Sequence, residues 1–168
     1  SAGIKQHQVT NQAKFAQKWA GELSGHRSNG LLVWAERDRR ARRRVLVVEA
    51  CMLTPDQDSG SMRMLALLEI LIEQGCKVTF AADSLEYRQP YVRDLQQRGV
   101  EVVFHPYATS ISELLGTRGV EFDLIVIARH YIAEKHMDAV RAFAPQALLV
   151  FDTVDLHFLR EERLAELE

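Results

Sequence analysis

The sequence has few of the residues that would indicate a disulfide-bonded, redox-active or membrane-spanning protein. Its 168 residues contain only two cysteines, Cys51 and Cys76, and neither lies in a Cys-x-x-Cys or Cys/His spacing. We therefore expect two free thiols, buried in the core of a protein from a reducing compartment. No stretch approaches the roughly 20 apolar residues of a membrane-spanning helix, and the amino terminus lacks the layout of a signal peptide.

Charge and nucleotide-binding motifs are equally sparse. The formal net charge of -2 gives no bias toward nucleic acid, so we expect no nucleic-acid partner. Neither G-x-G-x-x-G nor G-x-x-x-x-G-K-[ST] occurs, which argues against NAD chemistry and ATP hydrolysis. The "DQD" of Asp56 and Asp58 is similar to the metal-binding Asp-x-Asp of some sugar transferases. Two aspartates in a loop are not enough for a metal site, and we predict none.

What remains is ordinary globular material. With 47% apolar and 26% charged residues, the chain is long enough for one domain that buries roughly 70% of its unfolded surface. The chain begins at Ser1 and ends inside "FLREERLAELE", so we expect it to be a fragment of a longer protein.

Residues 1–44 differ in pattern from the rest and are predicted to form a helix followed by a basic linker. Apolar residues recur at helical spacing and indicate one amphipathic helix that ends near Gly25; they are Phe15, Ala16, Trp19, Ala20 and Leu23. Six arginines follow between Arg37 and Arg44. A solvated linker is the favoured interpretation of this run, and contact with lipid phosphates is the alternative.

From Val45 onward, short hydrophobic runs alternate with helical segments. The runs predict five strands, at 45–50, 77–82, 100–105, 122–128 and 147–152. Most are continuously hydrophobic, which favours strands buried on both faces of a parallel sheet. Helices are predicted between them at 61–74, from Pro90 to Gly99, and at 111–117 and 133–143. The alternation predicts that residues 45–168 form a Rossmann-like, doubly wound α/β domain with three layers.

In such sheets ligands bind beyond the carboxyl ends of the strands. The candidate segments are therefore those that follow each strand: 54–63, 83–84, 106–110, 129–131 and 153–157.

The first of these segments places Asp58, Ser59, Gly60 and Ser61 before a helix, whose unpaired amides favour an anion. Gly60 would let the backbone approach such a ligand closely. Capping of the helix by Asp58 or Ser59 alone would explain the same residues.

Two later segments hold ionisable residues. His130 follows the fourth predicted strand, between Arg129 and Tyr131, and its imidazole could bond a sugar hydroxyl or a developing leaving-group charge near pH 7. The stretch "FDTVDLHFLRE" after the fifth strand contains Asp152, Asp155 and His157; they are spaced so that some must point toward that edge of the sheet. Asp155 could instead cap the final helix.

Three stretches together resemble the amino-terminal half of a bacterial glycosyltransferase with the two-domain GT-B architecture, of the retaining kind grouped in family four. They are "TPDQDSGSMRMLALLEILIEQGCKVTF", "FDLIVIARHY" and "VFDTVDLHFLREER", and the resemblance covers residues 45–168. It implies a cytoplasmic enzyme that moves a sugar from a nucleotide-sugar to a glycan or lipid-linked acceptor during synthesis of surface polysaccharide. A peripheral position at the inner face of the membrane is compatible with this.

The resemblance also implies roles for individual residues. Ser59, Gly60 and Ser61 would approach the donor phosphates, although this loop has one glycine where many relatives have two. His130 would be the catalytic residue close to the transferred sugar. The acceptor side would be shaped by Asp58, Arg129, Asp155 and His157.

The family needs no metal or cofactor besides its nucleotide-sugar co-substrate, and its second domain supplies a Glu-x-x-x-x-x-x-x-Glu pair. That carboxyl-terminal domain is not contained in these 168 residues, so we expect the isolated chain to be inactive.

Other proteins share the five-stranded pattern. A flavodoxin-like or receiver-like signalling domain is one alternative, although a receiver domain needs a phosphorylatable aspartate at the end of its third strand, where this chain has "FHPY". A cobalamin-binding domain needs Asp-x-His-x-x-Gly after its first strand, which is absent. A non-catalytic domain that binds a sugar, a nucleotide or a lipid-linked acceptor remains open.

Overall fold

The computed structural model describes residues 2–27 and 32–153, with side chains from residue 5 onward. The chain divides between Arg39 and Arg40 into two compact units, which are described separately. The predicted division at 44/45 lies a few residues later, so the end of the arginine run belongs to the larger unit.

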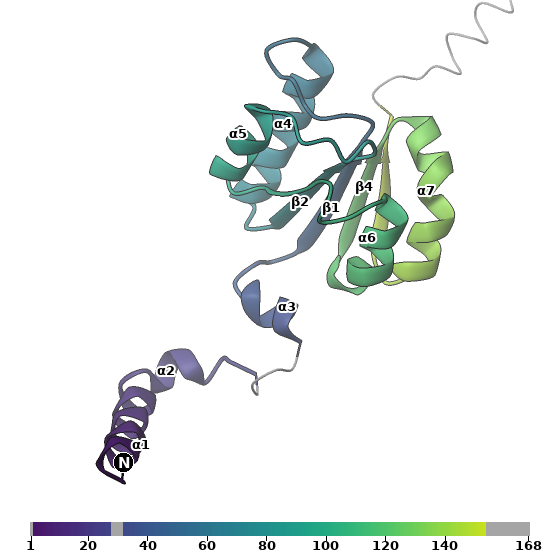
Figure 1. Ribbon diagram of the computed structural model, residues 1–168. Coiled ribbons are helices and arrows are strands. Elements are labelled where there is room, and N and C mark those ends of the chain that lie inside the picture. Colours follow the sequence, from purple (N-terminus) through teal and green to yellow (C-terminus); the bar gives the residue numbers. More distant parts are fainter. Residues whose placement is uncertain (1, 28–31, 154–168) are drawn as a thin grey trace, which may run out of the picture. The chain divides into compact units, whose positions relative to one another are not determined.

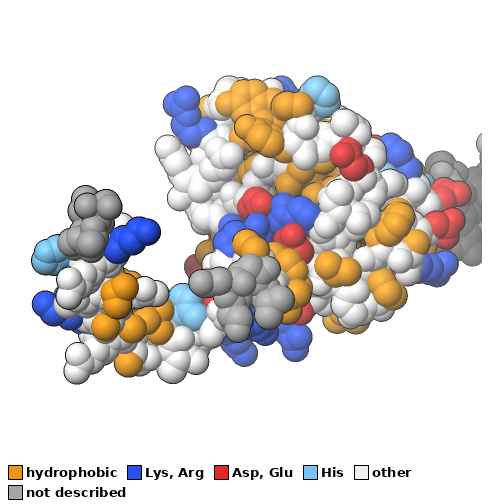
Figure 2. Space-filling model, turned by 60° about the horizontal axis from the view of Figure 1, so that its bottom comes forward, with side chains coloured by type: hydrophobic (Ala, Val, Ile, Leu, Met, Phe, Trp, Pro, Cys, Tyr) orange, Lys and Arg blue, Asp and Glu red, His pale blue; other side chains and the backbone are white. Residues whose placement is uncertain are grey.

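The smaller unit contains the helices α1 (Ala2–Lys18), α2 (Ala20–Leu23) and α3 (Val33–Arg37). The single helix predicted here is interrupted at Trp19, whose φ of -108° and ψ of 19° are not helical. The apolar side chains of this interrupted helix are exposed, with Phe15 at 57% and Trp19 at 44%. Figure 2 shows hydrophobic side chains at the surface of this unit. One positive charge of the arginine run is neutralised within the run itself, because the Arg37 guanidinium group pairs with the Asp38 carboxylate at 2.8 Å.

The larger unit is built on five parallel strands in the order β3-β2-β1-β4-β5. They are β1 (Arg44–Glu49), β2 (Lys77–Ala82), β3 (Glu101–Val103), β4 (Leu124–Ala128) and β5 (Leu148–Asp152). This confirms the predicted α/β fold with an all-parallel, Rossmann-like sheet. The register places Val47 of β1 between Phe80 of β2 and Val126 of β4.

Helices cover both faces of this sheet, as predicted. Figure 1 shows α4 (Ser59–Glu73) and α5 (Tyr91–Gln97) on one face, and α6 (Ile111–Arg118) and α7 (His130–Phe143) on the other. A short 3-10 helix, η1 (Gly119–Glu121), follows α6. The Gly predicted to end α4, Gly75, has a φ of 78°, the left-handed conformation of a helix C′ residue.

Alternate strand residues face the two helical layers. Val45 and Val47 pack with Met64 and Leu68 of α4, while Leu46 and Val48 belong to the core on the side of α6 and α7. All four β1 residues are fully buried, which explains why the strand is continuously hydrophobic.

Strand β5 differs from the other four. It lies at the edge of the sheet, and Leu148 and Val150 are 67% and 40% exposed. Burial on both faces therefore does not extend to this strand. No helix of the described residues has the length and apolar character that would let it cross a membrane.

Candidate functional site

A topological switch point lies between β1 and β4. The chain leaves β1 toward α4 on one face of the sheet and leaves β4 toward α7 on the opposite face. The two connections therefore part at the carboxyl ends of neighbouring strands, where ligands bind in open α/β sheets. Functional residues are expected at this carboxyl edge.

An ion pair between a buried carboxylate and a half-exposed arginine occupies the switch point. Glu49, the last residue of β1, is only 6% exposed. Its Oε1 accepts hydrogen bonds from the Ala50 amide at 2.9 Å and from Nε of Arg129 at 2.6 Å. The hydrogen bond to Glu49 raises the pKa of Arg129 above the usual range of arginine. Glu49 thus fixes the guanidinium group at the carboxyl edge.

The backbone of Arg129 is unusual as well. Its φ of 70° and ψ of 135° lie where residues other than glycine are rarely found. Because the chain turns so sharply here, α7 begins at the very next residue, His130. The prediction that α7 begins at Ala133 was therefore wrong, and His130 lies in the first turn of a helix.

His130 itself is exposed, and its ring meets that of Tyr131 edge to face, with 5.5 Å between the ring centroids. As the first residue of α7, it lies at the positive end of the helix dipole. An imidazole and a guanidinium group thus stand next to each other in the sequence at the switch point, beside helix amides that lack intrahelical partners.

A second polar cluster joins β2 to α7. The Asp83 carboxylate accepts a hydrogen bond from Nζ of Lys135 at 2.7 Å, and its Oδ1 atom lies 2.6 Å from Nε2 of His136. Burial alone would raise the pKa of Asp83, but the hydrogen bonds and charges of Lys135 and His136 outweigh it and lower that pKa. The Asp83 amide also donates to the Glu49 carbonyl at 2.7 Å, so this cluster adjoins the ion pair.

His136 of this cluster is 3% exposed. Its Nδ1 atom is buried and has no hydrogen-bond partner among the described residues.

The loop after β1 is held by its own side chains. Asp58 caps α4 by accepting from the Ser61 amide at 2.7 Å, and it also accepts from the Ser61 and Thr54 hydroxyls. The Ser61 hydroxyl accepts in turn from the Thr54 amide at 2.9 Å. The hydrogen bonds from Ser61 lower the pKa of Asp58, and the positive charge of Arg129 adds to this effect. The predicted cap is confirmed, and the loop lies close enough to Arg129 for their charges to interact.

Gly60 lies inside this hydrogen-bonded loop. A Cβ atom at this position would be 3.2 Å from Oδ1 of Asp58, so the close packing of the loop by itself favours glycine. With the Ser61 side chain 7% exposed and engaged, a ligand at this loop would meet mainly Ser59 and backbone amides.

No family model, curated protein or solved structure matches this chain. What the site does must therefore follow from its residues and their arrangement.

The two cysteines are free, as predicted, but one of them is not in the core. Cys51 is exposed because it lies in the bend just after β1, and Cys76 is half-buried. Partial burial and the nearby Glu49 carboxylate raise the pKa of Cys51, so its thiol stays protonated at neutral pH. No group of three or more His, Cys, Asp or Glu side chains able to hold a metal ion occurs within residues 2–27 and 32–153.

Of the candidates after β5, only Asp152 is described, because Asp155 and His157 lie outside the described residues. The Asp152 carboxylate accepts one hydrogen bond from each terminal nitrogen of Arg63, both at 2.7 Å. This ion pair ties the end of β5 to α4. It is therefore committed to an ion pair within the fold.

The structure places Arg129 close enough to Asp58 for their charges to interact, and His130 follows Arg129 in the chain. It adds Glu49, Lys135 and His136, which the sequence analysis did not select. Glu49 could have been suspected, because it is an ionisable residue at the end of a fully apolar strand. His136 could also have been suspected, because it lies on the buried face of α7, four residues after Ile132 and four before Val140.

Proposed function

We propose that this chain is the acceptor-side domain of a retaining, metal-independent glycosyltransferase with the GT-B architecture. The complete enzyme would move a sugar from a nucleotide-sugar to a glycan or lipid-linked acceptor in the synthesis of a surface polysaccharide. Its donor-binding domain would follow in the same polypeptide, in the cytoplasm or at the inner face of the membrane, and no nucleic acid would take part.

The observation that supports this proposal best is the arrangement at the switch point. A buried carboxylate, Glu49, holds Arg129 at the carboxyl edge, and an exposed imidazole, His130, opens α7 beside it. Sugar transfer separates charge between the sugar ring and the departing phosphate. Hydrogen-bond donors fixed in advance at such a place stabilise that charge without reorganising.

In this proposal His130 contacts the transferred sugar, while Ser59, Gly60 and Ser61 approach the donor phosphates. Because the Ser61 hydroxyl is engaged by Asp58 and Thr54, the phosphate approach would rest mainly on Ser59 and on backbone amides at the start of α4. Asp58 and Arg129 would shape the acceptor side, together with Asp155 and His157.

The first experiment is to read the gene beyond Glu168 and express the complete protein. A second βα domain with glutamates eight positions apart is the expected finding, followed by turnover of at least one member of a nucleotide-sugar panel. A reading frame that ends without such a domain would refute the transferase and leave a sugar- or nucleotide-binding domain.

The role of His130 is tested in that protein by His130→Ala, with His7→Ala in α1 as the matched control. We expect kcat to fall roughly 100-fold for His130→Ala, the loss typical of one donor to a developing charge, and to stay unchanged for the control. Unchanged turnover in His130→Ala would remove the histidine from the mechanism even if the protein is a transferase.

A further inference from the structure

A cavity of about 320 Å³ lies between the loop after β1, α4 and α5. It is separate from the switch point, and none of the residues assigned to sugar transfer lines it. The lining residues come from three segments and are Leu53, Pro55, Asp56, Leu65, Pro90, Tyr91, Asp94, Leu95 and Arg98. This volume is at the lower end of the range for small-molecule sites.

The cavity has an apolar floor. Leu53 and Leu95 are each 2% exposed overall and belong to the core between the sheet and its helices, and Leu65 of α4 packs against the same core. The floor therefore offers hydrocarbon contact to a compact ligand, and its position is fixed by the packing of the fold.

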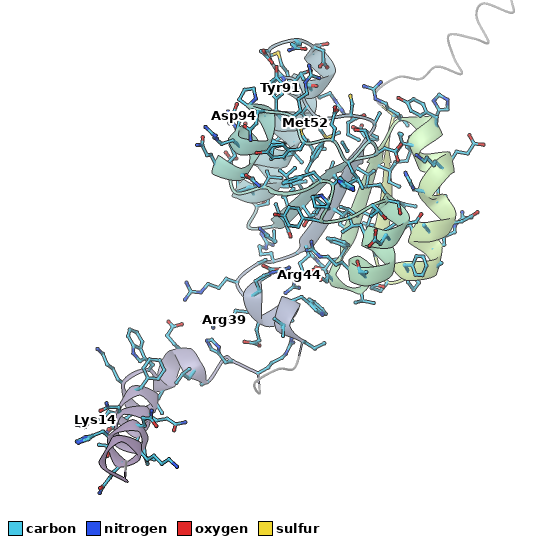
Figure 3. All side chains as sticks on the ribbon, viewed as in Figure 1. Lys14, Arg39, Arg44, Met52, Tyr91 and Asp94 are labelled. Atoms are coloured by element: carbon cyan, nitrogen blue, oxygen red, sulfur yellow. The ribbon has the colours of Figure 1, made fainter. Side chains whose placement is uncertain are left out.

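The rim of the cavity is polar and comes largely from one face of α5. Tyr91, Asp94 and Arg98 are spaced three and four residues apart, so their side chains lie on the same side of the helix and its C-cap. Figure 3 shows Tyr91 and Asp94 at the end of the sheet that the loop after β1 occupies.

Two of the rim groups are already satisfied within the fold. The Arg98 guanidinium group donates to the Glu69 carboxylate of α4. The Tyr91 hydroxyl accepts from Nε2 of Gln57 at 2.8 Å and bonds Asp56, and this bond to Asp56 raises the pKa of Tyr91. These contacts tie the loop and α4 to α5 around the cavity.

The charge at the rim is left unbalanced. Within the part of the chain that the structure describes, no side chain donates to the Asp94 carboxylate, and its nearest potential partner along the helix, Arg98, is turned to Glu69. Asp56 carries a second negative charge whose only described partner is a neutral hydroxyl. Arg88 adds a positive charge near this rim, because its guanidinium carbon lies 5.5 Å from the centre of the Tyr91 ring. Against the carboxylates of Asp56, Asp94 and Glu69, the two arginines Arg88 and Arg98 still leave one net negative charge, so the rim favours a positively charged group over an anion.

We propose that this cavity binds a small organic cation, a protonated amine joined to a compact hydrophobic body. The body would lie on Leu53, Leu65 and Leu95, and the ammonium group would bind Asp94, with Asp56 within the same rim. The site does not depend on the proposed sugar transfer, and it would serve a ligand distinct from the nucleotide-sugar and the acceptor.

The test uses three probes of nearly equal shape that differ in charge: benzylamine, benzyl alcohol and benzoate. Binding to the 168-residue chain at pH 7 is followed by amide chemical-shift changes in two-dimensional NMR. We expect saturable shifts for residues around Leu53, Leu65 and Leu95 with benzylamine, affinity roughly tenfold lower for benzyl alcohol, and no binding of benzoate. Equal affinity for the amine and the alcohol would overturn the proposal, and so would no binding of benzylamine up to its solubility limit.

Variants locate the charge that is recognised. Asp94→Asn keeps the shape of the side chain and should lower benzylamine affinity to that of the alcohol, while Asp138→Asn on the exposed surface of α7 should leave it unchanged. Asp56→Asn provides a second test should Asp94→Asn fail to fold. Unchanged benzylamine affinity in Asp94→Asn, or in Asp56→Asn where that second test is needed, would refute the role given to the rim.

Discussion

The substitution Gly119→Ala tests how tightly α6 and η1 pack against α7, the helix that begins at the candidate site. Gly119 is buried, and a Cβ added there would lie 2.4 Å from the carbonyl oxygen and 2.9 Å from the carbonyl carbon of Phe143. Both atoms belong to the backbone at the end of α7, so no side chain can rotate away. Either α7 or the segment around Gly119 must move.

The cost follows from these contacts. Overpacking of a well-packed core costs about 1–3 kcal/mol, and a clash between two backbone segments belongs at the upper end of that range. Replacing glycine by alanine recovers roughly 0.4–1 kcal/mol by restricting the unfolded chain. We expect the free energy of unfolding to fall by about 2 kcal/mol.

A matched control lies three residues earlier. At Gly116, in the interior of α6, an added Cβ would meet nothing closer than the Phe143 ring, at 3.9 Å. Gly116→Ala should therefore stabilise the protein by about 0.5–1 kcal/mol. The two variants carry the same chemical change and are expected to differ in sign.

The assay is urea unfolding followed by far-ultraviolet circular dichroism. Tryptophan fluorescence is unsuitable, because Trp19 and Trp34 both lie in the smaller unit. A Gly119→Ala protein as stable as the parent would show that the packing of η1 on the end of α7 is looser than described. Equal destabilisation by both variants would show that α6 itself does not tolerate alanine.

Three further predictions concern single ion pairs and caps, each measured by urea unfolding. Burial opposes ionisation of Glu101, but bonds from Arg118 and Thr79 lower its pKa in the folded state, so Glu101→Gln should cost about 1 kcal/mol at pH 7. The difference from the parent should begin to shrink as the pH falls below the unfolded value of 4.5 and should vanish only below the lowered pKa of the folded state. Asp58→Ala should cost about 1–2 kcal/mol through loss of the α4 cap, whereas Asp58→Asn should cost less than about 0.5 kcal/mol. Arg63→Ala should cost no more than about 1 kcal/mol, because its side chain is 52% exposed, and the loss should shrink at high salt.

The larger unit was predictable because its strands carry a strong local signal. In β1, four consecutive apolar residues are buried on both faces of the sheet, and in an alternating α/β pattern such a run indicates a central parallel strand. The exposure of β5 could not be read from its equally apolar sequence, because exposure at a sheet edge depends on which strand lies beyond it. Similarly, nothing in the sequence indicated that the helix of the smaller unit would break at Trp19.

The candidate site was only partly predictable for a related reason. The Asp58 cap depends on residues three apart in the chain, so local rules identified it. The pairing of Glu49 with Arg129 joins residues 80 apart, and that of Asp83 with His136 joins residues 53 apart. Those contacts exist only once β1, β2 and β4 are neighbours, and a single sequence does not give their order.

The strongest reason to place function at the switch point is that two features there lower the stability of the folded protein. The Glu49 side chain is 8% exposed while the Arg129 side chain is 38% exposed, so the carboxylate loses most of its hydration and this loss offsets part of its attraction to the arginine. Arg129 adds the cost of a left-handed backbone, of order 1–3 kcal/mol, at a position where glycine would avoid it. Sequences that break local rules usually do so where a ligand or a reaction requires it, and here two such features meet at the edge where an α/β sheet binds its ligands.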